Sequence, residues 1–126
     1  MAVAVQEALS EVDRVADAVV EMYGRWHEEA HQAQLVEFVD ATDVGAMRTI
    51  TCAERRTIEI VLDAELEAGS LLAGIWRLAQ GGHRVVVLVA LDRIGAAHPE
   101  LRGAPCRLQP YWLEGDRVCF GGLEIP

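Results

Sequence analysis

The sequence of 126 residues contains neither lysine nor asparagine, so all eleven of its Lys/Arg side chains are arginine. The lysine of a phosphate-binding Walker loop is therefore missing, as is the amine that Schiff-base catalysis requires. Any nuclease mechanism that depends on a catalytic lysine is excluded for the same reason. There is also no G-x-S-x-G element, and the Gly81-Gly82 pair precedes a predicted strand, which is the wrong side for a dinucleotide-binding loop.

Long apolar runs and paired cysteines are missing as well. The longest apolar run, 85–91, is far shorter than the roughly 20 residues that span a bilayer, so we expect no membrane segment. The first residues lack the basic region of a signal peptide. Cys52, Cys106 and Cys119 are widely spaced and form no CxxC pair. We expect reduced, buried thiols in a cytoplasmic protein.

Acidic side chains are concentrated in the first part of the chain. Residues 1–70 carry fifteen acids and five arginines, whereas residues 71–126 carry five acids and six arginines. The net charge of −9 does not attract nucleic-acid phosphates, so we expect no nucleic-acid partner. The length and the apolar fraction of 52% predict a single globular domain over residues 1–126.

Residues 1–34 are expected to form one long helix, because apolar residues recur at alternating steps of three and four, a heptad pattern. This helix would be roughly 45 Å long at 1.5 Å per residue, as long as the whole domain or longer. We therefore expect the seam over 9–19 to project past the sheet and to pair with a second chain as a homodimer. The alternative is a break at Gly24 that folds the helix back on itself. The predicted interface residues are Leu9, Val12, Ala16, Val19, Tyr23 and Trp26.

Residues 35–126 are expected to form a mixed β-sheet with packed helices, which gives an α+β class. Alternating side chains predict a hairpin of 35–40 with 46–51. The unbroken apolar run at 84–91 predicts a buried strand. A β-branched run predicts another strand at 57–62, so that these two strands form one βαβ crossover. The alternative for 57–62 is a helix that starts from a capping box formed by Thr51 and Glu54 and runs to Ala68.

Two further expectations complete the fold. In the strand interpretation of 57–62, Asp63 caps the crossover helix, which ends at Gly81-Gly82. The end of the chain is expected to form a hairpin that turns at 114–116.

The segment His27-Glu28-Glu29-Ala30-His31 has the H-E-x-x-H spacing of zinc peptidases. Two histidines four apart on a helix can bind zinc, and the glutamate can then activate a bound water. No third ligand follows at a matching distance, however, and the heptad pattern directs Glu28 to solvent. We therefore expect no zinc, with His27 and His31 as the weak candidates.

Carboxylates at the ends of the two predicted parallel strands offer another candidate site. Asp63 and Asp92 follow these strands, at the sheet edge where ligands of α/β proteins bind. Two such carboxylates could hold Mg²⁺, while Arg93 binds a phosphate and His98 acts as a general base. The structural alternative is that Asp63 is a helix cap and that Asp92 begins the next turn.

The sequence favours a non-catalytic cytoplasmic interaction or regulatory module that self-associates through its N-terminal helix and needs no cofactor. The alternative is a small metal-dependent phosphoester hydrolase that uses Asp63 and Asp92. A third, weaker hypothesis is a small-ligand sensor with a pocket between the N-terminal helix and the sheet. No complete catalytic constellation is recognisable in the sequence.

Overall fold

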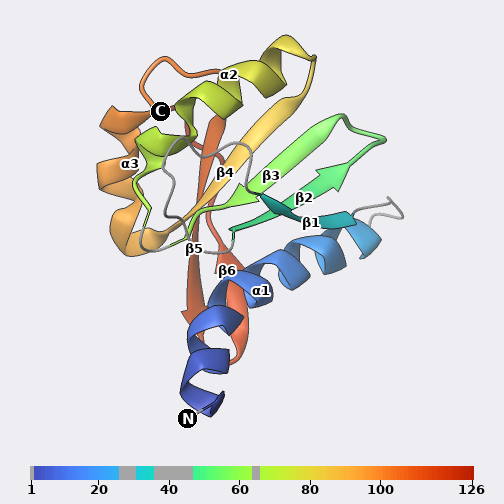
Figure 1. Cartoon of the computed structure of the whole chain (residues 1–126), viewed down its shortest axis with the longest axis vertical. Coiled ribbons are helices and arrows are strands. Elements are labelled where there is room, and N and C mark those ends of the chain that lie inside the picture. The colour runs from blue at the N-terminus through green and yellow to red at the C-terminus, as the bar shows by residue number, and fades with distance from the viewer. Residues whose placement is uncertain (1, 26–30, 36–46, 64–65) are drawn as a thin grey trace.

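The computed structural model describes the backbone of residues 2–25, 31–35, 47–63 and 66–126, and side chains from residue 11 onward except for 26–47 and 64–65. A helix comes first, and strands and helices follow (Figure 1). The elements are α1 (Ala2–Arg25), β1 (His31–Leu35), β2 (Met47–Cys52), β3 (Thr57–Val61), the 3₁₀ turn η1 (Ala68–Leu71), α2 (Leu72–Gln80), β4 (Arg84–Ala90), η2 (Leu91–Arg93), α3 (Ile94–Glu100), β5 (Arg107–Glu114) and β6 (Arg117–Phe120). The predicted α+β class is confirmed.

The six strands form one mixed sheet in which spatial order follows chain order. β1, β2 and β3 are antiparallel neighbours, and β5 and β6 form the predicted C-terminal hairpin. β3 and β4 are parallel, which confirms the strand at 57–62 and its crossover to β4. β4 and β5 are also parallel. This second crossover, through η2 and α3, was not predicted, because the expected sheet contained only one βαβ crossover.

The two faces of the sheet build separate cores, because successive side chains of a strand point to opposite faces. Ile58 and Ile60 of β3 belong to the core beneath α2 and α3. Val61 belongs to the second core, beneath α1. Thr57 and Glu59 share the face of Val61, so the α1 face of β3 carries two polar side chains.

The N-terminal helix is shorter than predicted, because it ends at Arg25 and His31–Leu35 is a strand. This strand pairs with β2, Leu35 lying opposite Met47. The predicted hairpin of 35–40 with 46–51 therefore begins earlier, and 36–46 lie outside the described residues. The physical reason lies in the sequence His-Gln-Ala-Gln-Leu. As an edge strand it gains hydrogen bonds with β2. As a helix it would contribute only one apolar residue, Ala33, to the heptad pattern before Leu35.

The expectation that the seam over 9–19 projects past the sheet is wrong for Ala16 and Val19. Ala16 and Val19 are fully buried in the core between α1 and the sheet of the same chain. Tyr23 is also buried there, and Val12 packs against this core while partly exposed. Only the N-terminal end of α1 extends beyond the sheet (Figure 1). The side chains of Leu9 and Trp26 lie outside the described residues.

An ion pair also attaches α1 to the sheet: Arg48 Nε of β2 lies 2.9 Å from Asp13 Oδ1. Within the described residues, α1 and the other helices are too short or too polar to cross a bilayer.

We predict that Val19→Ala lowers the free energy of unfolding by about 2 kcal/mol, because it removes two buried methyl groups and leaves a cavity under α1. Urea denaturation at two protein concentrations tests this. The matched variant Glu21→Ala, on the exposed side of the same helix, should change stability by less than about 0.5 kcal/mol. A Val19→Ala effect that disappears on dilution would instead place this residue between two chains.

Candidate functional site

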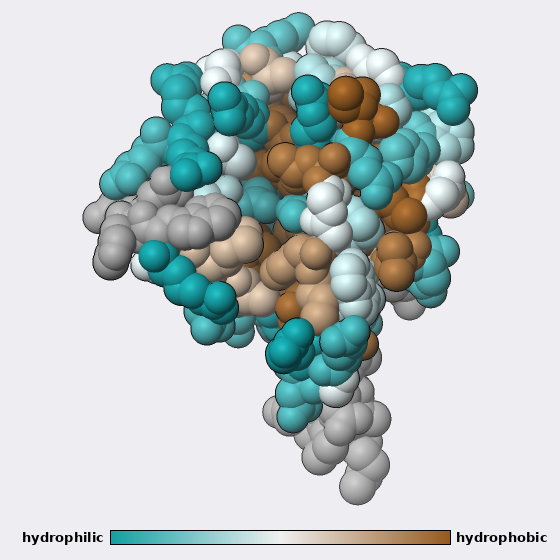
Figure 2. Space-filling view, turned by 180° about the vertical axis from the view of Figure 1, so that it is seen from behind, coloured by the Kyte–Doolittle hydropathy of each residue, from teal (hydrophilic) through white to brown (hydrophobic). Residues whose placement is uncertain are grey.

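The helix α1 covers only part of its face of the sheet. It packs on Val61, Leu88 and Tyr111, which lie toward the later parts of β3, β4 and β5. The first residues of the same strands remain open beside the end of α1. A cavity of about 740 Å³ lies there, within the size range of small-molecule sites. Seen from behind, this face of the molecule is hollowed near its centre (Figure 2).

Strand register brings the polar residues of the cavity together. Thr57 lies opposite Arg84 in the β3–β4 ladder. In the next row on this face, Glu59 lies opposite Val86, and Val86 lies opposite Arg107 of β5. Residues that are far apart in the sequence therefore meet on one patch of sheet, where they line the cavity.

Glu59 lies at the floor of the cavity. Its side chain is only 3% exposed, and its Oε2 atom has no hydrogen-bond partner among the described residues. The hydroxyl of Tyr23, from α1, donates a hydrogen bond to the carboxyl group. Burial raises the pKa of Glu59, and the hydrogen bond from Tyr23 opposes this effect only in part. Burial also raises the pKa of Tyr23, with a further contribution from Glu59, so the phenol stays a neutral donor.

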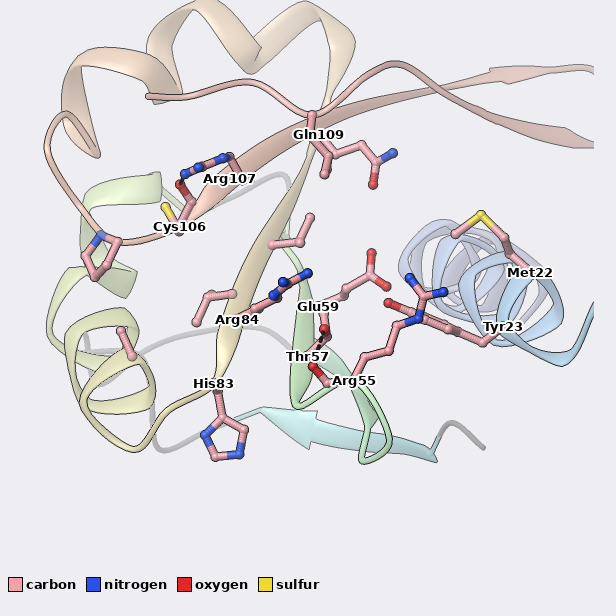
Figure 3. A pocket seen from close by; sticks show the side chains of 15 residues that line it. Met22, Tyr23, Arg55, Thr57, Glu59, His83, Arg84, Cys106, Arg107 and Gln109 are labelled. Atoms are coloured by element: carbon pink, nitrogen blue, oxygen red, sulfur yellow. Dashed lines mark hydrogen bonds between the residues drawn. The ribbon is translucent and has the colours of Figure 1, made fainter. Parts of the chain in front are cut away.

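Three arginines line the same cavity as this single carboxyl group. Arg55, Arg84 and Arg107 all line the cavity and are exposed at its rim, as the close view shows (Figure 3). Arg107 Nη1 donates to the carbonyl of Cys106 at 3.3 Å. The Arg84 guanidinium has no hydrogen-bond or ion-pair partner within the part of the chain that the structure describes. A locally cationic rim thus exists on a chain with a net charge of −9.

A fourth arginine fixes the backbone at the rim. Arg56 Nη2 donates to the carbonyl of Gly81 at 2.9 Å, and its Nε donates to Gly82 at 3.3 Å. The carbonyl of Arg56 in turn accepts from the amide of Arg84 at 2.7 Å. Gly82 has a φ of 86°, and a side chain there would also collide with Arg56, so this turn requires glycine. These bonds hold the turn before β3 against the start of β4, and thus place Arg55 beside Arg84.

Two other lining residues limit the chemistry of the cavity. Gln109 donates from Nε2 to the carbonyl of Gly121 at 2.9 Å, which fixes its amide at one side of the cavity. Cys106 is buried, and burial raises the pKa of its thiol to about 11. This thiol is therefore protonated near neutral pH and is a poor nucleophile.

The structure brings together only some of the predicted catalytic residues. Asp63, Asp92 and Arg93 lie close enough to the Tyr111 hydroxyl for their charges to act on it. Burial, with contributions from nearby acids, raises the pKa of Tyr111 to about 12. His98 faces elsewhere: its Nε2 lies 2.6 Å from Glu124 Oε1 on the C-terminal segment.

Arg93 has a structural position in this group. Its guanidinium donates to the carbonyls of Asp63 at 3.2 Å and Leu66 at 2.7 Å, which holds the segment that leaves β3. The predicted helix cap at Asp63 is wrong, because η1 begins at Ala68 and Glu67 occupies its N-cap without a side-chain hydrogen bond. Arg93 thus stabilises this segment by donating to its carbonyls, whereas a helix cap at Asp63 would have accepted from backbone N–H groups.

Among the described residues, no group of three or more His, Cys, Asp or Glu side chains is placed to hold a metal ion. The H-E-x-x-H segment does not continue a helix to its second histidine, because His31 begins β1. His27 lies outside the described residues. The geometry that two zinc ligands on one helix face would need is therefore not formed at His31.

The sequence interpretation included a pocket between the N-terminal helix and the sheet as its weakest hypothesis, but it named none of the residues that line this cavity. Its signal was a glutamate at an inward position of an apolar strand, in Thr57-Ile58-Glu59-Ile60-Val61. Such a residue is rarely buried unless it has a partner or a function. The arginines gave no comparable signal, because each is an ordinary residue at the start of a strand or in a turn.

Comparisons of the chain with protein-family models, with curated proteins and with solved structures found no match.

We predict that Arg93→Ala lowers the free energy of unfolding by about 1–3 kcal/mol, because two carbonyls lose a charged donor. Urea denaturation measures this change. Arg102→Ala removes an exposed arginine from the turn after α3 and should change stability by less than about 0.5 kcal/mol. Equal effects of the two substitutions would show that the bonds of Arg93 do not stabilise the fold.

We also predict that Glu59→Gln becomes increasingly stable relative to the wild type as pH rises from about 4 to about 8. The folded-state pKa of Glu59 is raised, so the native chain keeps a proton that the unfolded chain releases. The stability due to this proton is complete below the unfolded pKa and is lost as pH rises through the folded pKa. Glutamine does not titrate and avoids this loss.

Denaturation midpoints of Glu59→Gln and the wild type across this pH range test the prediction. Glu114→Gln, at an exposed carboxyl group in the C-terminal hairpin, is the control and should follow the wild-type curve. A constant difference between Glu59→Gln and the wild type at all pH values would contradict the raised pKa.

Proposed function

We propose that this chain is a non-catalytic binding domain for a small anionic molecule, which occupies the cavity between α1 and the sheet. The observation that carries the proposal is the convergence of Arg55, Arg84 and Arg107 on one cavity of about 740 Å³ in a chain that is otherwise acidic. Guanidinium groups bind carboxylates and phosphates through paired hydrogen bonds. This supports the sensor hypothesis more than the other functions considered from the sequence.

Electrostatics favours an anion at the rim rather than a metal ion. Of the charged lining residues, three are arginines and one is Glu59. A divalent cation needs several oxygen ligands, whereas this cavity offers a single carboxylate and repels a cation through its rim. The overall negative charge of the chain repels anions at long range, so an anionic ligand is attracted only at short range, by the arginines of this opening.

The lining chemistry supports binding without catalysis. The thiol of Cys106 is protonated, and the Tyr23 hydroxyl is engaged with Glu59. His83 also lines the cavity, but its Nδ1 lies 3.3 Å from the carbonyl of Leu78. Neither a paired nucleophile and base nor an acid–base couple is assembled from these groups. A domain of this kind would act as a regulatory or sensor module.

Self-association is a separate expectation, and it has lost its main support. Ala16 and Val19 were among the residues expected to form a dimer interface, but they pack within one chain. The proposal therefore does not require a dimer. A regulatory role could instead involve a different protein that binds this chain only when its ligand is bound.

We predict that Arg84→Gln and Arg107→Gln each weaken the binding of small anions by about tenfold or more, since each removes a charge-assisted hydrogen-bond donor. The probes are inorganic phosphate and glutarate. Their affinities can be measured by ¹H–¹⁵N chemical-shift titration, which also shows whether the affected amides belong to β3, β4 and β5.

Arg102→Gln makes the same change of net charge outside the cavity and should leave both affinities as in the wild type. The proposal fails if neither probe changes the chemical shifts of amides that line the cavity. It also fails if Arg84→Gln and Arg107→Gln bind each probe with the same affinity as Arg102→Gln.

A further inference from the structure

The buried carboxyl group of Glu59 is not explained by anion binding alone. When ionised, this carboxyl group would repel an anion held by the rim, and when protonated it adds no positive charge, so a pocket for a simple anion gains no attractive charge from Glu59. Its Oε2 atom is buried and has no hydrogen-bond partner in the described part of the chain, although three guanidinium groups line the same cavity. Burying such a group without a partner is costly, and it persists where the surrounding structure or a function maintains it.

Glu59 lies deeper in the cavity than Arg84 and Arg107. Glu59 extends from the middle of β3, beside the buried hydroxyl of Tyr23, whereas Arg84 and Arg107 begin β4 and β5 and are exposed. In the close view the carboxyl group of Glu59 points into the cavity, between Tyr23 and Gln109 (Figure 3). The cavity therefore has a cationic rim and an acceptor at its floor.

We infer that the ligand carries a protonated amino group in addition to its anionic group, and that Glu59 binds this amine while Arg84 and Arg107 bind the anion. The inference rests on the proposed function and narrows it to zwitterionic ligands, such as amino acids or aminoalkyl phosphates. An ammonium group supplies three donors and a positive charge, which is the partner that Oε2 lacks. The raised pKa of Glu59 agrees with a carboxyl group that is poorly solvated until such a partner arrives.

Tyr23 has a positioning role in this arrangement. Its hydroxyl comes from α1 and donates to the carboxyl group from the side opposite the sheet. This bond restricts the rotation of the Glu59 side chain and uses one part of its acceptor capacity. The remaining oxygen is left for the ligand.

The test compares small acids that share a carbon skeleton and differ in one group. The carboxylate probes are glutarate, 2-hydroxyglutarate and L-glutamate, and the phosphate probes are ethyl phosphate and O-phosphoethanolamine. Affinities are measured by chemical-shift titration with the full wild-type chain, so the main comparison needs no variant. The series that binds more tightly identifies whether the arginines prefer a carboxylate or a phosphate.

We expect the wild type to bind the amine-bearing member of the preferred series at least tenfold more tightly than the other members. Glu59→Gln should bind all members of that series within about twofold of one another, because glutamine cannot form the ionic bond. Glu114→Gln is the matched control outside the cavity and should keep the wild-type preference. Arg84→Gln should weaken every member and leave the preference for the amine unchanged.

Equal wild-type affinity for the amine-bearing probe and its analogues overturns the inference, as does a preference that survives in Glu59→Gln. A tie between 2-hydroxyglutarate and L-glutamate overturns it too, since it would assign Glu59 to a hydroxyl group. In these cases anion binding that depends on Arg84 still supports the proposed function. Absence of binding by every probe, or binding that Arg84→Gln does not change, removes the proposed function together with the inference.

Discussion

The incomplete cover that α1 gives to the sheet determines the rest of this structure. The helix packs on Val61, Leu88 and Tyr111 and stops at Arg25, so α1 itself does not cover the beginnings of β3, β4 and β5 on this face. The strand residues packed against the helix are apolar, whereas the part of the face beside it also carries Thr57, Arg84 and Arg107. Glu59 lies at this boundary, with Tyr23 of the helix as its partner on one side and the cavity on the other.

The parallel arrangement of β3, β4 and β5 brings charged residues together in the part of the sheet that α1 leaves uncovered. Parallel neighbours begin at the same edge, so residues that start different strands come together there. Arg84 and Arg107 both occupy such positions, and the turn that contains Arg55 and Arg56 reaches the same edge. An antiparallel partner in place of β4 or β5 would have sent one of these arginines to the opposite end of the sheet.

The same topology explains why the carboxyl ends of β3 and β4, where a catalytic site was predicted, do not form a ligand-binding cavity among the described residues. Asp63 and Asp92 do follow neighbouring parallel strands, as expected. The end of the sheet at which they lie is, however, the end that α1 covers and that Tyr111 fills. Arg93 uses its donors on backbone carbonyls of the adjoining segment. The open space is thus at the amino-terminal ends of the strands, opposite the edge where α/β proteins usually bind ligands.

The sequence by itself determined the α+β class and the C-terminal hairpin, because these depend on local periodicity and on turn residues. It favoured a strand at 57–62 but left a helix open, and the pairing with β4 excludes that helix. It also determined that every strong cation is arginine. Tertiary structure alone decided where the N-terminal helix ends and which side of its seam is buried, since a heptad pattern is satisfied equally by a second helix or by a sheet. It decided the site as well: Glu59, Arg84 and Arg107 are separated along the chain, and only the register of three strands places them around one cavity.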